Sequence, residues 1–585
     1  MTPDNIEAKV KVVEVAQPTK TVVVPVDKEK VAPKGPLHFM DLSVDIKSLI
    51  VSHVHRPTEL KNLCLTCSQM HHITVRKLYH EVTLEVGSST DAKLTSFINP
   101  RNIGLPHIRK LDLYLAEVAD KCNQLQQAHF AIRMILEFLP ENILEKFSWH
   151  PWSPFLADNL VLLYKKQRRM EWLEGIALDR NVLPELEKQG DFDQIFTKTR
   201  RLGLYPDSRD VLNFCANLLK RTKKVEKITL HASFDEDSDR TPIPSRELND
   251  SSTDLGLITR TMFGHMEPFE KCTPLSLKDL TLQKINLRYA ANSYCKFIDF
   301  RVMKALRIFG CPGADSLFAE LSKSHKLPER LETLEFKHDD NPENDALNAL
   351  DGFLKLVSGI KVLTMDICYA KQLPSADGII RHSRTLRELN MHGSRGDGEE
   401  EELVIDFDDF EKICKSCSLI EQLSMAFPTT SLIRPISDSF QAFENALGDL
   451  ANLITLNITT WPTNTPSTSR LPRKTYEILL QALANSGFEH SIHHASSRTP
   501  PRSSKLAVIA FGSSDRVYDR EDSKNQIIFV KGKQIDPFGG EKPLAVQVGW
   551  CLRKFVEPRS DVLDFSLARS CRPPTREPPA SEDSE

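Results

Sequence analysis

The chain has 585 residues and a formal net charge of −4, with 76 Lys and Arg residues against 80 Asp and Glu residues. This balance argues against a nucleic-acid-binding protein, which usually carries a basic excess, and no apolar run approaches the roughly 18 residues of a membrane helix. The N-terminal region is charged throughout and predicts no signal peptide. We therefore expect the 12 cysteines to be reduced thiols of a cytoplasmic or nuclear protein.

The sequence contains five polar stretches: one at each end and three within the predicted folded region. Residues 1–36 alternate Lys, Glu, Val and Pro, which predicts a disordered arm. Residues 569–585 form a Pro-rich tail with an acidic end, also expected to be disordered. Inserted loops are expected near 234–254, 395–411 and 459–473. The second loop is rich in carboxylates and predicts a solvated acidic surface, with binding of a cation or a basic partner as the alternative.

Residues 37–86 predict a module of three short helices. The apolar residues of 44–54 recur on one stripe, Pro57 ends that helix, and Thr58 can cap a second helix. A third helix is expected over about 68–79. A segment of this size can bury only a small core. Apolar residues left on its surface would suit docking onto a partner.

This module resembles an F-box, a family whose helices carry Leu-Pro-x-Glu-Ile, then Leu-x-x-Leu-x-x-x-Cys, and end near Leu-Tyr. The chain carries the matching motifs in the same order: Leu42-Ser43-Val44-Asp45-Ile46, Leu60-x-x-Leu63-Cys64-x-x-Cys67 and Leu78-Tyr79. It departs from the family where Ser43 replaces Pro, although serine also caps helices, and where Asp45 replaces Glu. A helical cap that binds no partner is the alternative. The resemblance implies an adaptor-binding surface made of Leu42, Ile46, Ile50, Leu60, Leu63 and Cys64.

Between residues 100 and 555 the motif apolar-x-x-apolar-x-apolar recurs, and many copies precede a helix-like stretch. Copies begin at Ile108, Leu144, Leu173, Val225, Leu277, Met303, Leu331, Ile360, Leu386, Ile420 and Leu453, with a weaker strand from Lys505. Several intervals lie within or near the 20–29 residues of a leucine-rich repeat. The intervals on either side of Val225 are about twice as long, so each should hold a degenerate repeat or an insertion. The predicted fold class is α/β: an irregular leucine-rich-repeat solenoid of parallel strands and helices, with a generic α/β body as the alternative.

The strands of such a solenoid offer a working face. Apolar motif positions point into the core, so the positions between and just after them point to the concave side. The seventh position of successive copies mixes aromatic rings, imidazoles and both signs of charge, which suits protein recognition. A polar face without a ligand is the alternative. The substrate-binding residues expected there are Tyr114, His150, His231, Gln283, Phe309, Lys337, Asp366 and His392.

The whole layout resembles F-box proteins with leucine-rich repeats, which are substrate-receptor subunits of cullin–RING (SCF-type) ubiquitin ligases. The resemblance implies that the module binds a small adaptor subunit and, through it, the cullin scaffold. It implies that the repeats present a protein substrate for ubiquitination and that the chain has no active site. The alternative is a leucine-rich-repeat scaffold for protein–protein interaction, without a link to ubiquitin ligases.

Two Cys-x-x-Cys pairs have the residue types of a zinc site. Cys64 and Cys67 precede two adjacent histidines, and Cys414 and Cys417 form the second pair. Both pairs lie in helix-like apolar patterns, and the histidine spacing of a zinc finger is missing, which favours core packing of the thiols over metal or redox chemistry. No sequence motif of a serine hydrolase, zinc protease or phosphate-binding loop occurs. We expect no metal, cofactor or catalytic residue, with a triad assembled from distant residues as the alternative.

Overall fold

The computed structural model describes residues 39–54, 57–86, 91–115, 121–149, 154–174, 177–178, 198–206, 208–232, 256–269, 271–323, 325–339, 345–395, 402–433, 435–463, 473–498, 500–512, 526–535, 539–548 and 560–563. The predicted arm at 1–36, the tail at 569–585 and the loop at 234–254 lie outside the described residues.

One 16-stranded sheet runs through the described residues, and its neighbours pair in parallel from the first strand to β16. The last two strands, β17 and β18, add antiparallel. In order, the strands are β1 (Glu81–Val86), β2 (Lys110–Leu115), β3 (Lys146–Trp149), β5 (Trp172–Glu174), β7 (Arg201–Leu204), β8 (Lys227–His231), β9 (Asp279–Gln283), β10 (Ala305–Phe309), β11 (Thr333–Asp339), β12 (Val362–Cys368), β13 (Glu388–Gly393), β14 (Gln422–Met425), β15 (Thr455–Ile458), β16 (Val508–Phe511), β17 (Ile527–Ile535) and β18 (Glu541–Val548). A separate short pair consists of β4 (Pro154–Phe155) and β6 (Ala177–Leu178).

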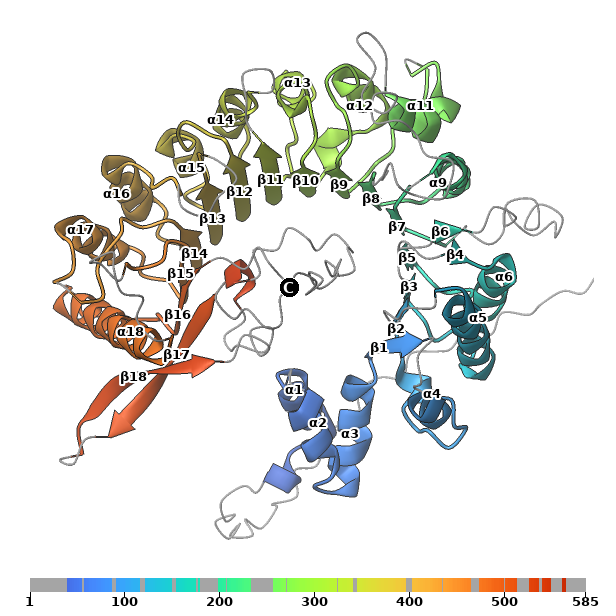
Figure 1. Ribbon diagram of the computed structural model, residues 1–585, viewed down its shortest axis with the longest axis horizontal. Coiled ribbons are helices and arrows are strands. Elements are labelled where there is room, and N and C mark those ends of the chain that lie inside the picture. The colour runs from blue at the N-terminus through green and yellow to red at the C-terminus, as the bar shows by residue number, and fades with distance from the viewer. Residues whose placement is uncertain are drawn as a thin grey trace, which may run out of the picture.

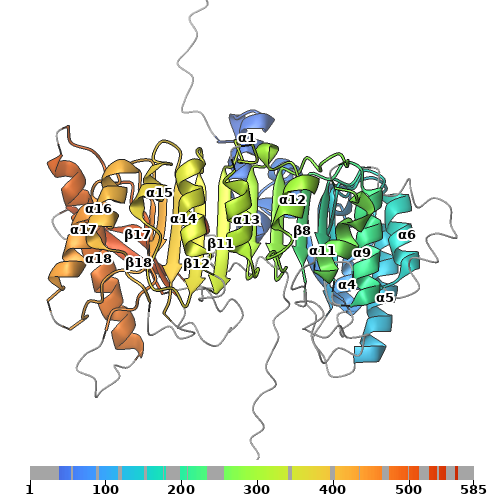
Figure 2. The same cartoon turned by 90° about the horizontal axis from the view of Figure 1, so that it is seen from above.

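The strands line the inner side of a curved band, and a layer of helices covers its outer side (Figures 1 and 2). The outer helices are α4 (Asp91–Phe97), α5 (Lys121–Phe138), α6 (Ala157–Lys166), α9 (Arg209–Arg221), α11 (Leu257–Phe263), α12 (Ala291–Phe297), α13 (Ala314–Leu321), α14 (Leu347–Leu356), α15 (Ala376–Ile380), α16 (Phe407–Ser416), α17 (Asp438–Leu447) and α18 (Arg473–Ser497). Single 3-10 turns are η1 (Phe39–Asp41), η2 (Leu105–His107), η3 (Gly264–Met266), η4 (Phe300–Val302) and η7 (Asp561–Leu563). The architecture is an α/β repeat solenoid, as the repeated motif predicts. No helix among the described residues is long and apolar enough to cross a membrane.

The core lies between the sheet and the helices and is built from the apolar motif positions. Leu334, Leu363 and Leu389 pair in register on β11, β12 and β13, and each is fully buried. The residues just before them, such as Thr333 and Glu388, are only half-buried. Strand alternation therefore sends one set of side chains to the core and the other to the concave face, as predicted.

Cys311 stabilises the turn that follows β10 in the repeat that begins at Met303. The Cys311 thiol is buried, accepts a hydrogen bond from the Ile285 amide at 3.5 Å, and lies 3.5 Å from the carbonyl oxygen of Leu282. A side chain there satisfies backbone groups that the turning chain leaves outside the ladder. The nine cysteines whose side chains the structure describes are free thiols.

The predicted copy at Leu173 is out of frame. In β5, Leu173 pairs with Phe147, which is the fourth motif position of its neighbour. This repeat therefore begins at Met170, whose side chain is 1% exposed. The error arose because Leu173 is also followed by apolar residues at the spacing of a first position.

The two long intervals around Val225 have different causes. The first holds a repeat that the sequence analysis missed: β7 pairs with β5 and buries Leu202 and Leu204. Its signal was weak because Thr199, which is polar, takes the first motif position. In the second interval, β8 pairs directly with β9, so no strand is missing there and the extra residues are an insertion. The helix between these strands, α11, packs on α9 in the outer layer.

Two element boundaries differ from the expected ones. Residues 81–86, expected within the helical module, form β1 and pair with β2. Residues 407–411, expected in the acidic loop, belong to α16. Asp406 caps this helix by accepting a hydrogen bond from the Asp408 amide at 2.9 Å, and Phe410 gives it a buried face.

The helical module consists of α1 (Val44–Ser52), α2 (Pro57–Cys64) and α3 (Ser68–Leu78). Its small core contains Val51, Leu60 and Met70 and is separate from the core of the solenoid. The module joins the sheet where Tyr79, directly after α3, packs beside Gly104. Figure 1 shows the three helices next to the first strands.

Candidate functional site

Most of the predicted substrate-binding residues form one row along the concave face. His231, Gln283, Phe309, Lys337, Asp366 and His392 pair side by side across β8 to β13. Parallel register brings them together, because each takes the same place in its repeat. Tyr114 lies apart on β2, where it is exposed and pairs with Glu85 of β1. His150 lies outside the described residues.

The row is more buried than a simple polar face. His231 is 1% exposed and packs edge-on against the ring of Tyr205, with the ring centroids 6.0 Å apart. Phe309 and Asp366 are also buried, whereas Gln283 and Lys337 are half-buried. The concave face therefore presents a few accessible groups above a tightly packed layer.

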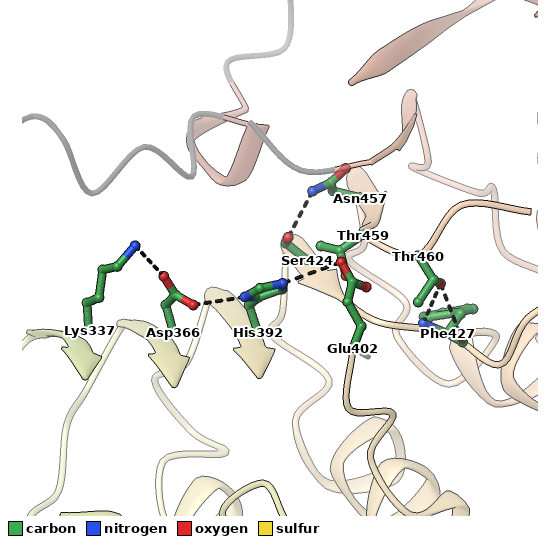
Figure 3. A network of polar contacts seen from close by, with 9 residues as sticks. All are labelled: Lys337, Asp366, His392, Glu402, Ser424, Phe427, Asn457, Thr459 and Thr460. Carbon is green, nitrogen blue, oxygen red and sulfur yellow. Dashed lines mark hydrogen bonds and ion pairs between the residues drawn. The ribbon is translucent and has the colours of Figure 1, made fainter. Parts of the chain in front are cut away.

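A chain of charged groups crosses the end of the row (Figure 3). The Lys337 ammonium lies 2.9 Å from Oδ2 of Asp366, and the other Asp366 oxygen lies 2.8 Å from Nδ1 of His392. Nε2 of His392 lies 3.4 Å from Oε1 of Glu402. The second Glu402 oxygen accepts a hydrogen bond from the Thr459 hydroxyl at 2.9 Å. The positive charges of Lys337 and His392 thus balance the negative charges of Asp366 and Glu402 in a largely buried site.

The surroundings of His392 favour its protonated form. Burial alone would lower its pKa, but the hydrogen bonds to Asp366 and Glu402 and their negative charges raise the pKa to about 10. Burial would in turn raise the pKa of Asp366, but His392 and Lys337 hold it below its usual range. The imidazolium therefore acts as a fixed cation between two carboxylates at neutral pH.

Glu402 was missed by the sequence analysis. It lies within the carboxylate-rich stretch, where the chain returns to the end of β13. Glu402 forms an isolated β-bridge with Ser394, and the Leu403 amide donates a 2.8 Å hydrogen bond to the Gly393 carbonyl. At this end of β13, Gly393 leaves space for the Leu373 side chain, which a Cβ would meet at 2.7 Å. Nothing in a run of similar carboxylates distinguishes the one that turns inward.

A second charged line, across the middle of the strands, was also missed. Lys227 lies 3.0 Å from Asp279, and Arg307 bridges Asp279 at 2.6 Å and Glu335 at 2.9 Å. These residues take the third and fifth motif positions, which the analysis expected on the concave side without naming them. Their alternating charge in successive copies was the available signal.

The N-terminal part of the concave face carries an aromatic residue among cations. Trp172 is half-buried and pairs in register with Lys146 on one side and Arg201 on the other. The Lys146 ammonium lies 4.6 Å from the ring centroid, and the Arg201 guanidinium lies 5.2 Å from it. Such cation–π contacts fix the orientation of the indole ring. A fixed aromatic ring is a suitable contact residue for a protein partner.

The predicted adaptor-binding residues divide into an exposed set and a core set. Ile46 and Ile50 are exposed on α1. Leu60 lies in the module's own core, 4% exposed, and Leu63 packs against that core. Leu42 and Cys64 are half-buried.

The exposed set is larger than the prediction. Val44 and Leu49 of α1 are also exposed, Leu49 to 61%. Ile46, Leu49 and Ile50 recur on one side of the helix, and we call these three residues the α1 apolar stripe. The periodicity of the sequence places Leu49 on one stripe with Ile46 and Ile50. The predicted adaptor-binding set omits Val44 and Leu49 because they stand between the family's motif positions.

The two Cys-x-x-Cys pairs serve in packing and capping. Cys414 and Cys417 are buried, and burial raises the pKa of the Cys417 thiol to about 11. The Cys67 thiol caps α3 by accepting a hydrogen bond from the Met70 amide at 3.5 Å. Within the described ranges, no group of three or more His, Cys, Asp or Glu side chains could hold a metal ion.

Comparison with known proteins identifies no family. No protein-family model matches the chain. No curated protein matches it either. Among solved structures it is similar to one titled "Crystal structure of Rad7 and Elc1 complex in yeast", with 15% sequence identity and a TM-score of 0.36, over 73% of this chain and 91% of that chain. Similarity at this level carries no argument about function.

Proposed function

We propose that this chain is the substrate-recognition subunit of an SCF-type E3 ubiquitin ligase. In this proposal the helical module is an F-box that docks the adaptor and, through it, the cullin scaffold. The solenoid, a set of leucine-rich repeats, binds a protein substrate for ubiquitination. Other subunits would perform the transfer chemistry, so the chain would need no catalytic group or cofactor. A cytoplasmic or nuclear location would agree with its free thiols.

The α1 apolar stripe carries the proposal. Its residues Ile46, Leu49 and Ile50 lie on one short helix and are exposed to between 39% and 61%. Burying an aliphatic side chain of this kind yields about 1.5–3 kcal/mol relative to leaving it exposed, so the stripe favours a partner that covers it. Its place in an F-box-like motif order makes the ligase adaptor the best candidate partner.

The concave face supports the second half of the proposal. Its parallel strands present the Trp172 ring, which neighbouring cations hold in place, together with rows of ion-paired side chains and half-buried polar residues. Aromatic anchors with compensating charges are typical of protein-binding surfaces.

The test is binding of purified adaptor–cullin complex to the full chain, measured by calorimetry. We expect the wild-type chain to bind, and Ile46→Asp/Leu49→Asp to weaken binding at least about tenfold, a loss of about 1.4 kcal/mol or more. Charges at Leu60 or Leu63 would be a poor test, because these residues support the module's own core.

The matched control is Leu356→Asp, which puts the same charge on an exposed leucine of α14. It should bind as the wild-type chain does. Unchanged binding by the double variant would contradict the docking surface. If the wild-type chain did not bind, the protein would be a repeat scaffold without a ligase link.

A further inference from the structure

A segment of the chain itself lies on the concave face. The turn η7 (Asp561–Leu563) contacts β13, β14 and β15 from inside the curve, where Figure 1 draws it as a short red ribbon. Val562 and Leu563 are 4% and 1% exposed. We propose that Ser560–Leu563 is an internal ligand of a peptide-binding site on this face, and that a substrate segment must displace it. The proposal rests on the proposed function only in calling the competing segment a substrate.

The polar part of this site forms hydrogen bonds with a backbone amide and a hydroxyl group of the turn. The Val562 amide donates a hydrogen bond to Oε1 of Gln422 at 3.1 Å. The hydroxyl groups of Ser560 and Thr455 lie 2.6 Å apart. Gln422 and Thr455 pair in register on β14 and β15, so one row of strand side chains holds the turn.

The apolar part begins at β16, where apolar residues take the strand positions that are polar in β14 and β15. The third motif position is Gln422 in β14 and Thr455 in β15, but Val508 in β16. The fifth position likewise changes to Ala510. Leu563 packs on Val508 and Ala510 and on Ile528 of β17. The site is therefore polar at one end and apolar at the other, which sets the direction of a bound segment.

The face is organised without help from the turn. The Asn457 amide donates to the Ser424 hydroxyl at 2.9 Å, and its oxygen accepts a hydrogen bond from Gln526 at 3.4 Å. Neither bond involves the turn, so removal of the turn leaves both in place. A preformed site binds with a smaller loss of conformational entropy, which fits a surface that can exchange one segment for another.

These contacts define the chemistry of the partner. It is a peptide segment with a small hydroxyl residue followed, two and three positions later, by two aliphatic residues, as Ser560, Val562 and Leu563 are. Tethering gives the internal segment an effective concentration of about millimolar order. An external segment must therefore bind more tightly, or through additional contacts, to replace it.

The experiment uses the full chain and a fluorescent peptide with the sequence of residues 557–567, followed by anisotropy. The wild-type chain should bind the peptide weakly, because its own turn competes. Leu563→Asp, which places a charge where the turn packs on Val508, Ala510 and Ile528, should bind the same peptide at least about tenfold more tightly. A peptide with Asp at the positions of Val562 and Leu563 should bind neither chain, and Leu356→Asp should behave as the wild-type chain does.

Equal binding of the peptide to the wild-type and Leu563→Asp chains would overturn the proposal, as would failure of a folded Leu563→Asp chain to bind it. If Leu563→Asp does not fold, native-state hydrogen exchange of Leu563→Ala decides the question. Faster exchange of the Val562 amide alone supports an exchangeable ligand, whereas faster exchange throughout β14 to β16 would make the turn part of the core. The assay contains no adaptor, so its failure is distinct from failure of the proposed ligase function.

Discussion

His392 carries a positive charge inside the concave face because two carboxylates surround its ring. Burying one charge alone is strongly unfavourable, but Asp366 and Glu402 lie within 2.8 Å and 3.4 Å of the two ring nitrogens. Lys337 balances the remaining negative charge. At the residue scale, therefore, the charged groups depend on one another, and removal of one leaves another unpaired.

This dependence predicts a pH-sensitive cost for His392→Gln. Because the pKa of His392 is raised from 6.5 to about 10, its stabilising effect is complete below about pH 6.5 and is lost as the pH rises towards 10, by about 1.4 kcal/mol per pH unit at most. We expect the variant to be less stable than the wild type by about 3–5 kcal/mol at pH 6 and the difference to shrink by pH 9.5. Urea denaturation at both pH values measures it.

The control is His72→Gln, which changes an exposed histidine of α3. It should alter stability by less than about 0.5 kcal/mol at either pH. A His392→Gln deficit that stayed constant between pH 6 and pH 9.5 would mean that the histidine is neutral in the folded protein.

At the scale of elements, the junction between the helical module and the sheet depends on one close contact. The two parts have separate cores, and the Tyr79 ring covers Gly104 so closely that a Cβ there would lie 2.2 Å from ring atoms. A glycine is needed at this position for space rather than for its backbone conformation. The contact sets how α3 leads into β1.

A double-mutant cycle tests this junction. Gly104→Ala should destabilise the protein by about 1–3 kcal/mol, because the added methyl group displaces the ring. In a Tyr79→Ala background the same change should cost much less, since the ring that it would meet is gone. Thermal or urea denaturation of the four proteins gives the coupling energy. Equal costs in both backgrounds would show that Tyr79 does not fill this space.

Much of the fold follows from one repeated pattern, and the exceptions have local causes. Leu334, Leu363 and Leu389 were placed correctly because apolar period and strand alternation agree there. The β7 repeat was missed where polar Thr199 replaces an apolar residue. The α1 stripe was predicted from its period, but the predicted adaptor-binding set contains only Ile46 and Ile50 of it, since only these two belong to a motif.

Contacts between distant segments are what the sequence could not provide. Glu402 reaches His392 through a returning loop, and Val562 reaches Gln422 across 140 positions of sequence. Neither approach leaves a periodic pattern, because each depends on how the whole band curves. The row at the seventh position could be predicted, whereas the groups that complete it could not.

At the scale of the whole molecule, each repeat contacts mainly its neighbours, and stability should be correspondingly local. Leu363→Ala should lower the opening free energy of β11 to β13 by about 2–5 kcal/mol. The amides of β2 and β3 should keep their protection. Glu388→Ala, on the concave side of the adjacent strand, should cost about 0.5 kcal/mol or less. Native-state hydrogen exchange measures both regions in each variant.

Equal costs for the two variants would contradict the assignment of core and concave sides. Loss of protection along the whole sheet in Leu363→Ala would show instead that the solenoid unfolds as a single unit.

The antiparallel end of the sheet has a consequence for association between molecules. A solenoid with parallel strands at both ends could add the first strand of one copy to the last strand of another and grow into a filament. Here the hairpin reverses the chain twice, so β18 again runs in the direction of β1 to β16. However, β18 contains Pro543, which has no amide hydrogen to donate. Glu541 and Lys542 add charge to the same strand. The closing hairpin thus keeps a long, regular sheet from serving as a template for head-to-tail polymerisation.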